Sequence, residues 1–231
     1  MTGTFTDLWI AIALFFVTHS LPSLRKIRAR LVAAVGERTY TIAYSCFSVG
    51  STAWMIVAAI HAPYLELWPM TVPAMWATAT IMALAGLLLV VGLTTPNSLS
   101  IHVWPKKFDA TRPGALVVTR HPVLWALGLW ALGHLVSNGD AGTAILFGLG
   151  GAFALLGCLI LDIRRRREFG IEPWRQMTAA TSIIPFWGIV TGKAAMPWRA
   201  LSWRAALTAV LYAVLIWLHQ PVIGVSPLPP F

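Results

Sequence analysis

The chain has 231 residues, of which 58% are hydrophobic and only 11% are charged. Soluble globular domains carry about 25% charged residues, so this composition excludes a domain surrounded by water and indicates a protein whose solvent is largely lipid. The net charge of +9 invites a nucleic-acid interpretation, but the basic residues flank hydrophobic segments. We therefore expect them to face anionic lipid headgroups, and we expect no nucleic-acid partner.

Six apolar segments along the chain are candidates for membrane-spanning helices. A helix needs about 20 apolar residues to cross the hydrocarbon layer, because every backbone polar group must be bonded within the segment. The sequence therefore predicts an all-α membrane helical bundle of about six transmembrane helices, forming a single domain over residues 1–231. The predicted spans are Leu8–Leu24, Thr41–Ala62, Pro73–Thr94, Pro122–Asn138, Ala141–Leu161 and Trp203–His219.

The placement of the basic residues predicts the orientation of these helices. All seventeen Lys and Arg residues fall in or beside the segments that follow the first, third and fifth predicted helices, which six helices would bring to one side. Lys and Arg accumulate in cytoplasmic loops, so both termini are expected on the outer side of an inner membrane. The first apolar segment precedes a basic run, the reverse of the order in a signal peptide, and is expected to be retained.

Two cytoplasmic segments are longer than simple connections between helices need to be. They run from Thr95 to Arg120 and from Asp162 to Arg199. Long loops in compact domains are usually functional or disordered. Both segments contain aromatic and apolar residues, so we expect packed structure that lies at the membrane interface.

Two histidines lie inside predicted spans and are candidates for chemistry. Ionisable residues within membrane segments are functional candidates by default, because burying them unpaired is costly. His19 and His134 are such residues, and imidazoles on facing helices commonly ligate a b-type haem. A hydrogen-bonding role is an equally good interpretation of each. Zinc is less favoured because no helix pairs a His with a Glu one turn away, and a catalytic triad lacks support because Ser20 directly follows His19.

The segment Thr119–Pro122 marks the start of the fourth predicted helix. Pro122 occupies the first turn, which tolerates proline because its missing N–H would have no helical partner. Free N–H groups at a helix start, with the Arg120 side chain alongside, favour binding of a phosphate, a carboxylate or a haem propionate. A helix cap with an interfacial arginine is the alternative interpretation.

Three sequence motifs resemble those of a known family. They are THSLPSLR (Thr18–Arg25), TRHPVLWALGLWALGHLVSNGD (Thr119–Asp140) and TSIIPF (Thr181–Phe186). Together they resemble the NnrU family of bacterial membrane proteins, over nearly the whole chain. The resemblance implies a multi-pass protein of the bacterial inner (cytoplasmic) membrane with a role linked to denitrification, that is, to nitrite and nitric oxide metabolism.

The NnrU family is similar in turn to the plant 15-cis-zeta-carotene isomerase, a membrane enzyme that contains haem b. The histidines implicated as haem ligands in that enzyme correspond to His19 and His134, so the resemblance implies these two as metal ligands. On this haem hypothesis, Arg120 and His121 are expected to serve a propionate or substrate corner, and a small apolar or redox-active ligand is a possible partner. Ala131 replaces a cysteine of the isomerase, so a Cys-to-His ligand switch is not expected.

The depths of the two predicted ligands constrain the haem hypothesis. At about 1.5 Å per residue, His19 lies roughly 9 Å along its helix from Arg25, whereas His134 lies about 21 Å from Arg120. If both cations mark one membrane face, a haem bound by both imidazoles must be tilted, or the start of the fourth helix must lie at a different depth.

A second similarity leads to a different class of function. The RHP motif and the later segment RREFGIEPWRQMTAATSIIPF look like the membrane methyltransferases that modify isoprenylcysteine, in which these stretches build a cofactor pocket at the cytoplasmic face. This alternative predicts an S-adenosylmethionine pocket built by Arg120, His121, Glu168 and Arg175. A third possibility is a non-catalytic assembly factor, in which the two membrane histidines would not matter. Whether the chain is an enzyme stays open at this point.

Overall fold

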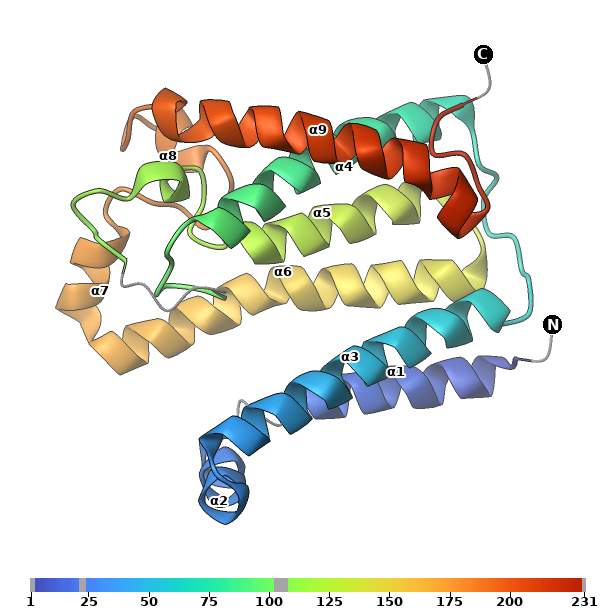
Figure 1. Cartoon of the computed structure of the whole chain (residues 1–231), viewed down its shortest axis with the longest axis horizontal. Coiled ribbons are helices and arrows are strands. Elements are labelled where there is room, and N and C mark those ends of the chain that lie inside the picture. The colour runs from blue at the N-terminus through green and yellow to red at the C-terminus, as the bar shows by residue number, and fades with distance from the viewer. Residues whose placement is uncertain (1–2, 21–23, 102–107, 230–231) are drawn as a thin grey trace. The chain divides into compact units, whose positions relative to one another are not determined.

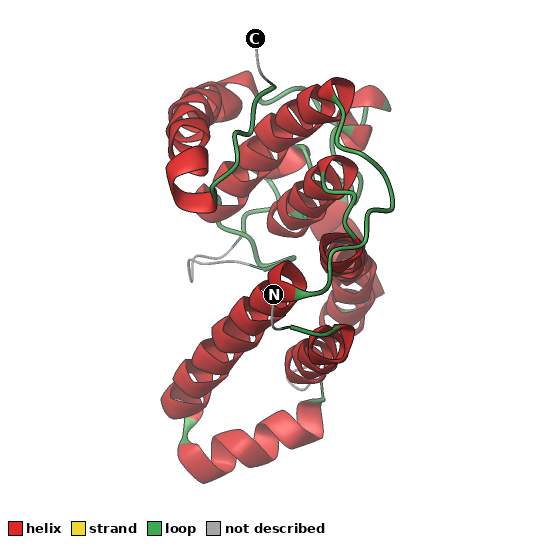
Figure 2. Ribbon diagram, turned by 90° about the vertical axis from the view of Figure 1, so that its right-hand side faces the viewer, coloured by secondary structure: helices red, strands yellow, loops and turns green. Residues whose placement is uncertain are grey.

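The computed structural model describes residues 3–20, 24–101 and 108–229 of the chain (Figure 1). These residues form helices and loops (Figure 2). Among them, Glu66 and Asp140 form one isolated antiparallel β-bridge. The prediction of an all-α fold is therefore confirmed.

Six long apolar helices and four shorter helical elements occur in the described residues. The six long ones are α1 (Phe5–Ser20), α3 (Glu37–His61), α4 (Val72–Thr94), α5 (Pro122–Ser137), α6 (Ala141–Phe169) and α9 (Trp198–Ile223). The shorter ones are α2 (Arg25–Val35), the 3-10 helix η2 (Gly114–Val117), α7 (Ile171–Thr178) and α8 (Trp187–Val190). Each predicted span overlaps one of the six long helices.

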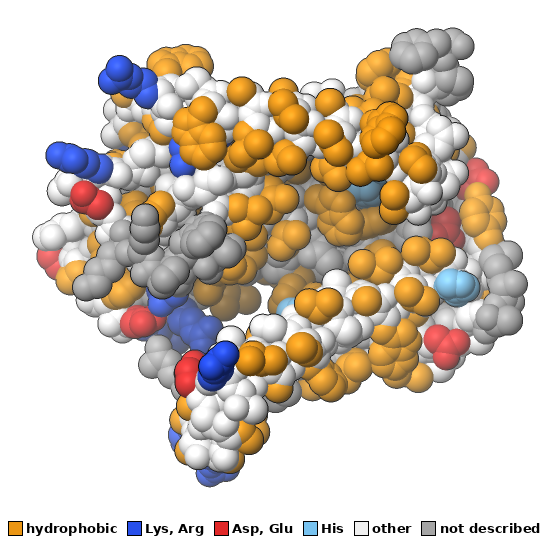
Figure 3. Space-filling view, viewed as in Figure 1, with side chains coloured by type: hydrophobic (Ala, Val, Ile, Leu, Met, Phe, Trp, Pro, Cys, Tyr) orange, Lys and Arg blue, Asp and Glu red, His pale blue; other side chains and the backbone are white. Residues whose placement is uncertain are grey.

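The length and surface of these helices support a membrane-embedded bundle. Helices α3, α4, α6 and α9 are long and apolar enough to cross a bilayer. Helices α1 and α5 have 16 residues each, or about 24 Å, somewhat less than the hydrocarbon thickness. Apolar side chains cover much of the visible surface of α9 (Figure 3), and its exposed apolar residues include Val210, Leu215 and Trp217. The count of six spans and the outward termini stay predictions.

Helices α6 and α9 extend furthest beyond the spans predicted for them. Helix α6 continues past Leu161 to Phe169, and α9 begins at Trp198, before Trp203. The extensions carry Arg164–Arg167 and other residues that the sequence assigned to a loop. Arginine is a good helix former, and its long side chain reaches the interface from a helix, so a run of arginines need not end the helix.

The chain divides into two compact units. Unit 1 contains Met1–Pro69 and Asn138–Leu146, and unit 2 contains Met70–Ser137 and Phe147–Phe231. Helix α6 is continuous from one unit into the other. The prediction of a single domain stays a prediction.

In unit 1, α1 packs antiparallel to α3. One face of α1, formed by Leu8, Ala11, Ile12 and Phe15 at helical spacing, is buried. Gly3, just before α1, lies against the backbone of His61 at the end of α3, which defines the antiparallel direction.

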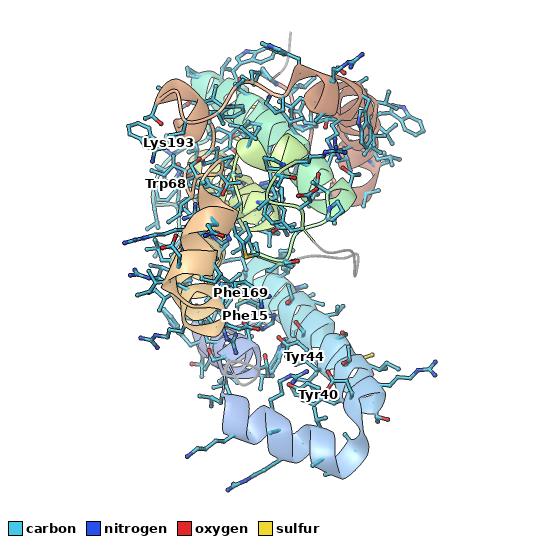
Figure 4. The ribbon with its side chains drawn as sticks, turned by 90° about the vertical axis from the view of Figure 1, so that its left-hand side faces the viewer. Phe15, Tyr40, Tyr44, Trp68, Phe169 and Lys193 are labelled. Carbon is cyan, nitrogen blue, oxygen red and sulfur yellow. The ribbon has the colours of Figure 1, made fainter. Side chains whose placement is uncertain are left out.

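Helix α2 follows at the other end of this pair, where the Arg28 guanidinium lies 5.6 Å from the ring centre of Tyr40. Tyr40 and Tyr44 stack along α3 with ring centres 6.2 Å apart (Figure 4). The contacts of Arg28 and Tyr40 join α2 to the start of α3.

In unit 2, α4 and α5 pack closely and antiparallel. The Thr78 hydroxyl near the start of α4 donates to the carbonyl of Gly133 near the end of α5, with a distance of 2.7 Å. Gly92 near the end of α4 faces Pro122 and Val123 at the start of α5. The core between these elements and the start of α9 is formed by Leu88, Val91, Ala115, Val118, Ala126 and Leu201.

The close approach of α4 to α5 gives a test of this packing. A Cβ at Gly92 would lie 2.5 Å from Val123 Cγ2 and 3.1 Å from the Val123 backbone nitrogen. We expect Gly92→Ala to lower the free energy of unfolding by about 1–3 kcal/mol, because the overpacked backbone must shift. Gly150→Ala is the matched control, since a Cβ there meets nothing within 4 Å and alanine favours the helix by up to about 1 kcal/mol. Unfolding in mixed micelles measures both, and equal stability of the two variants would contradict the packing.

A buried ionic cluster as the candidate functional site

Two segments that carry the family resemblance lie side by side in unit 2. Residues 118–120, just before α5, run along residues 182–186, just before α8. The Arg120 backbone N–H donates to the Ser182 carbonyl with a distance of 3.0 Å. Further bonds run from Thr119 Oγ1 to the Ile183 carbonyl (2.7 Å) and from the Phe186 N–H to the Val118 carbonyl (2.8 Å). These bonds hold the start of α5 in place without a regular strand.

Arg120 forms the centre of the site. Its Nε lies 2.9 and 3.0 Å from the two carboxylate oxygens of Asp162 on α6, and its Nη2 also donates to that carboxylate. The indole ring of Trp174 lies 5.7 Å from the guanidinium carbon, within range of a cation–π interaction. The Arg120 and Asp162 side chains are 11% and 13% exposed, so the ion pair is largely removed from solvent.

His121 is fully buried beside this ion pair. Its Nε2 lies 2.8 Å from Asp162 Oδ1, and its Nδ1 lies 2.8 Å from the hydroxyl oxygen of Ser100. Because an ionised carboxylate only accepts hydrogen bonds, Nε2 carries the proton. In the neutral imidazole, Nδ1 then accepts a hydrogen bond from the Ser100 hydroxyl.

Asn97 connects the chain after α4 to this cluster. Its side-chain amide donates to the Arg120 carbonyl at 2.9 Å, and its side-chain oxygen accepts from the Leu99 N–H at 2.9 Å. Asn97 is fully buried. These two bonds set the path of the chain so that Ser100 reaches His121.

Asp162 is the residue of the cluster that the sequence pattern does not identify. The pattern places it at the first position of a loop, whereas it lies within α6. A signal was available, since Asp162 is an acidic residue directly after a long apolar run and shortly before four arginines. Its partners lie more than forty residues away in sequence, so no local pattern identified them.

The other predicted cofactor residues lie elsewhere. His19 is in the last turn of α1 in unit 1, where its Nδ1 lies 2.9 Å from the Phe15 carbonyl and its Nε2 lies 2.7 Å from Ser48 Oγ. His134 is in the last turn of α5 in unit 2, with Nδ1 2.8 Å from the Trp130 carbonyl. The structure brings Arg120 and His121 together, and places His134 at the opposite end of their helix.

The residues of the methyltransferase alternative are not all gathered at the cluster. Glu168 forms an ion pair with Arg165 at 2.9 Å, and Arg175 lies 3.7 Å from Glu172. The side chain of Arg175 is 73% exposed. The described contacts therefore unite Arg120 and His121 with Asp162, whereas the charges of Glu168 and Arg175 are paired on α6 and α7.

Long apolar helices with exposed apolar side chains define a multi-pass integral membrane protein. Among the described residues, no group of three or more His, Cys, Asp and Glu side chains is close enough to hold a metal ion. A sequence model of the family described as NnrU protein matches residues 7–227, so the chain belongs to the NnrU family. Comparisons with curated proteins and with solved structures found no match.

The ion pair between Arg120 and Asp162 gives a second test. Asp162→Asn leaves the buried guanidinium without its counter-charge, so we expect a loss of up to about 3 kcal/mol in the free energy of unfolding. Glu168→Gln, which removes a carboxylate that is 45% exposed from the pair with Arg165, is the control and is expected to cost less than about 1 kcal/mol. Denaturant titration in mixed micelles measures both, and an Asp162→Asn protein as stable as the control would contradict the assignment.

Proposed function

We propose that this NnrU family member is a haem b protein of the bacterial inner membrane that acts in nitrite or nitric oxide metabolism, with His19 and His134 as iron ligands. Two features shared by the histidines support the proposal, an aromatic ring beside each imidazole and a helix carbonyl that orients each ring. In each, Nδ1 lies within 2.9 Å of the carbonyl oxygen four residues earlier in the helix.

The helix carbonyl determines which ring nitrogen is presented to a metal. A carbonyl oxygen only accepts, so Nδ1 must carry the proton, and in the neutral ring Nε2 then has the lone pair. Metal-bound histidines commonly donate their other N–H to a carbonyl or a carboxylate in this way. At His19 the Ser48 hydroxyl donates to Nε2, so this hydroxyl must turn away before iron binds.

Aromatic rings lie beside both imidazoles. The Phe15 ring lies with its centre 4.0 Å from that of His19. The rings of Trp130 and Phe147 lie 5.1 and 5.0 Å from His134. Apolar aromatic surfaces of this kind suit the flat face of a porphyrin, and bound haem would supply an iron centre able to carry an electron or bind a small gas.

The role of Arg120 and His121 as a propionate or substrate corner stays a prediction, with two constraints. The Asp162 carboxylate already fills the anion position of Arg120, so an external carboxylate must displace it. His121 and His134 are also thirteen residues apart along the chain, about 20 Å at helical rise. The two histidines therefore cannot ligate the same iron.

We also propose that helix α2 binds anionic lipid. The side chains of Lys26, Arg28 and Arg30 on α2 are exposed, beside the exposed apolar side chains of Ile27 and Leu31. Helix α2 contains no acidic residue. A basic helix with exposed apolar side chains fits the boundary between headgroups and acyl chains in a leaflet with anionic lipids.

Absorption spectroscopy of protein made in haem-replete cells tests the haem proposal. We expect a Soret band that shifts on reduction, and at least about a tenfold loss of bound haem in His19→Ala and in His134→Ala. His61→Ala is the matched control, because His61 also lies in the last turn of a helix with Nδ1 2.8 Å from a carbonyl four residues earlier.

Absence of haem from the wild-type protein would refute the proposal, as would equal haem content in all three variants. The methyltransferase alternative keeps one supporting observation, the hydrogen bonding between residues 118–120 and 182–186. Calorimetric binding of S-adenosylmethionine to haem-free protein would favour that alternative, since the haem proposal predicts no such binding.

A further inference from the structure

Ser100, His121 and Asp162 form a continuous chain of hydrogen bonds that takes no part in the proposed ligation of iron by His19 and His134. Both links measure 2.8 Å, from the Ser100 hydroxyl to His121 Nδ1 and from His121 Nε2 to Asp162. The three residues come from the loop after α4, the start of α5 and the body of α6. A hydroxyl, an imidazole and a carboxylate in this order are the constellation that activates a nucleophile, and it is recognised by geometry whatever the sequence order.

The carboxylate determines how the imidazole can act. Asp162 accepts a hydrogen bond from the Nε2–H group, which leaves the Nδ1 lone pair directed at the Ser100 hydroxyl. Arg120 donates to both oxygens of the carboxylate, which favours its ionised form and fixes its orientation. Arg120 is therefore a positioning residue in this arrangement, and His121 is placed to act as a general base.

We propose that Ser100 is a nucleophile that accepts the acyl group of a membrane-borne ester or thioester. Ser100 Oγ attacks the carbonyl carbon while its proton moves to His121 Nδ1. The bond from the carbonyl carbon to the leaving oxygen or sulfur then breaks, and the leaving group takes that proton. Water, deprotonated by the same imidazole, later cleaves the acyl-serine and restores the hydroxyl.

The location of Ser100 indicates the class of substrate. Ser100 is 3% exposed and the next residue, Ile101, is 44% exposed, so the chain reaches the surface directly after the buried serine. The site occurs where apolar helices end, and α6 continues past Asp162 into four consecutive arginines. An amphiphile with an acyl chain and an anionic headgroup matches this combination of apolar surface and positive charge.

Ser182 offers a matched control within the same unit. It is buried to a similar extent, at 8% exposed, and lies in the segment that pairs with Arg120. Its hydroxyl donates to the Ile184 carbonyl at 2.7 Å. A carbonyl cannot accept a proton as a base does, so Ser182 lacks the activation proposed for Ser100.

An alkyl fluorophosphonate tests the proposal on the full-length protein in mixed micelles. We expect the probe to form a covalent adduct on Ser100, identified by peptide mass spectrometry, with at least about a tenfold loss of labelling in His121→Gln and no adduct in Ser100→Ala. Ser182→Ala should label like the wild type. Absence of a Ser100 adduct in the wild-type protein overturns the proposal, as does labelling that persists in His121→Gln.

A thiol at the same position gives a second measurement that does not depend on the phosphonate. With Cys46→Ser and Cys158→Ala as background, we expect Ser100→Cys to react with iodoacetamide at pH 6 at least about tenfold faster than Ser182→Cys, because a neighbouring imidazole promotes the thiolate. Adding His121→Gln should remove the difference. Equal rates for the two cysteines overturn the proposal.

Discussion

The carboxylate of Asp162 is the group on which the organisation of unit 2 depends. It accepts hydrogen bonds from Arg120 and His121, and it thereby ties the start of α5 to α6. Removing a charge from water costs several kcal/mol, which an ion pair offsets only when its hydrogen bonds are made. Here the Arg120 guanidinium donates to both carboxylate oxygens, and His121 donates a further hydrogen bond. The hydrogen bonds that the buried ion pair needs are therefore made.

A second buried arginine at the same end of unit 2 is stabilised differently. Arg204 on α9 donates to the hydroxyl of Thr94 at 2.8 Å and to the Thr94 carbonyl at 3.2 Å, at the last residue of α4. The carbonyl end of a helix carries partial negative charge, so a guanidinium there is favoured without a carboxylate. The two arginines together fix the ends of α4, α5, α6 and α9, which leaves the opposite end of the unit to neutral contacts such as Thr78 with Gly133.

The six long helices could be predicted from the sequence because lipid imposes a simple rule, a long apolar run with internal hydrogen bonds. The ends of α6 and α9 could not, since arginine ends an apolar run without ending a helix. Arg120 and His121 were identifiable from their position at a helix start. Ser100 and Asp162 were not, because their contacts with His121 are set by how separate helices pack. The sequence gives no support for a catalytic triad around His19. The structure instead places a hydroxyl, an imidazole and a carboxylate in that order around His121.

The proton positions on the histidine rings test the central claim most directly. Solid-state NMR of protein reconstituted in lipid at pH 8, with nitrogen-15 in the histidines, distinguishes the two neutral tautomers. If Asp162 holds His121, the His121 ring carries its proton on Nε2, whereas His19 and His134 carry theirs on Nδ1. A His121 ring protonated only on Nδ1 would contradict the account, because Nε2 could then donate no hydrogen bond to Asp162.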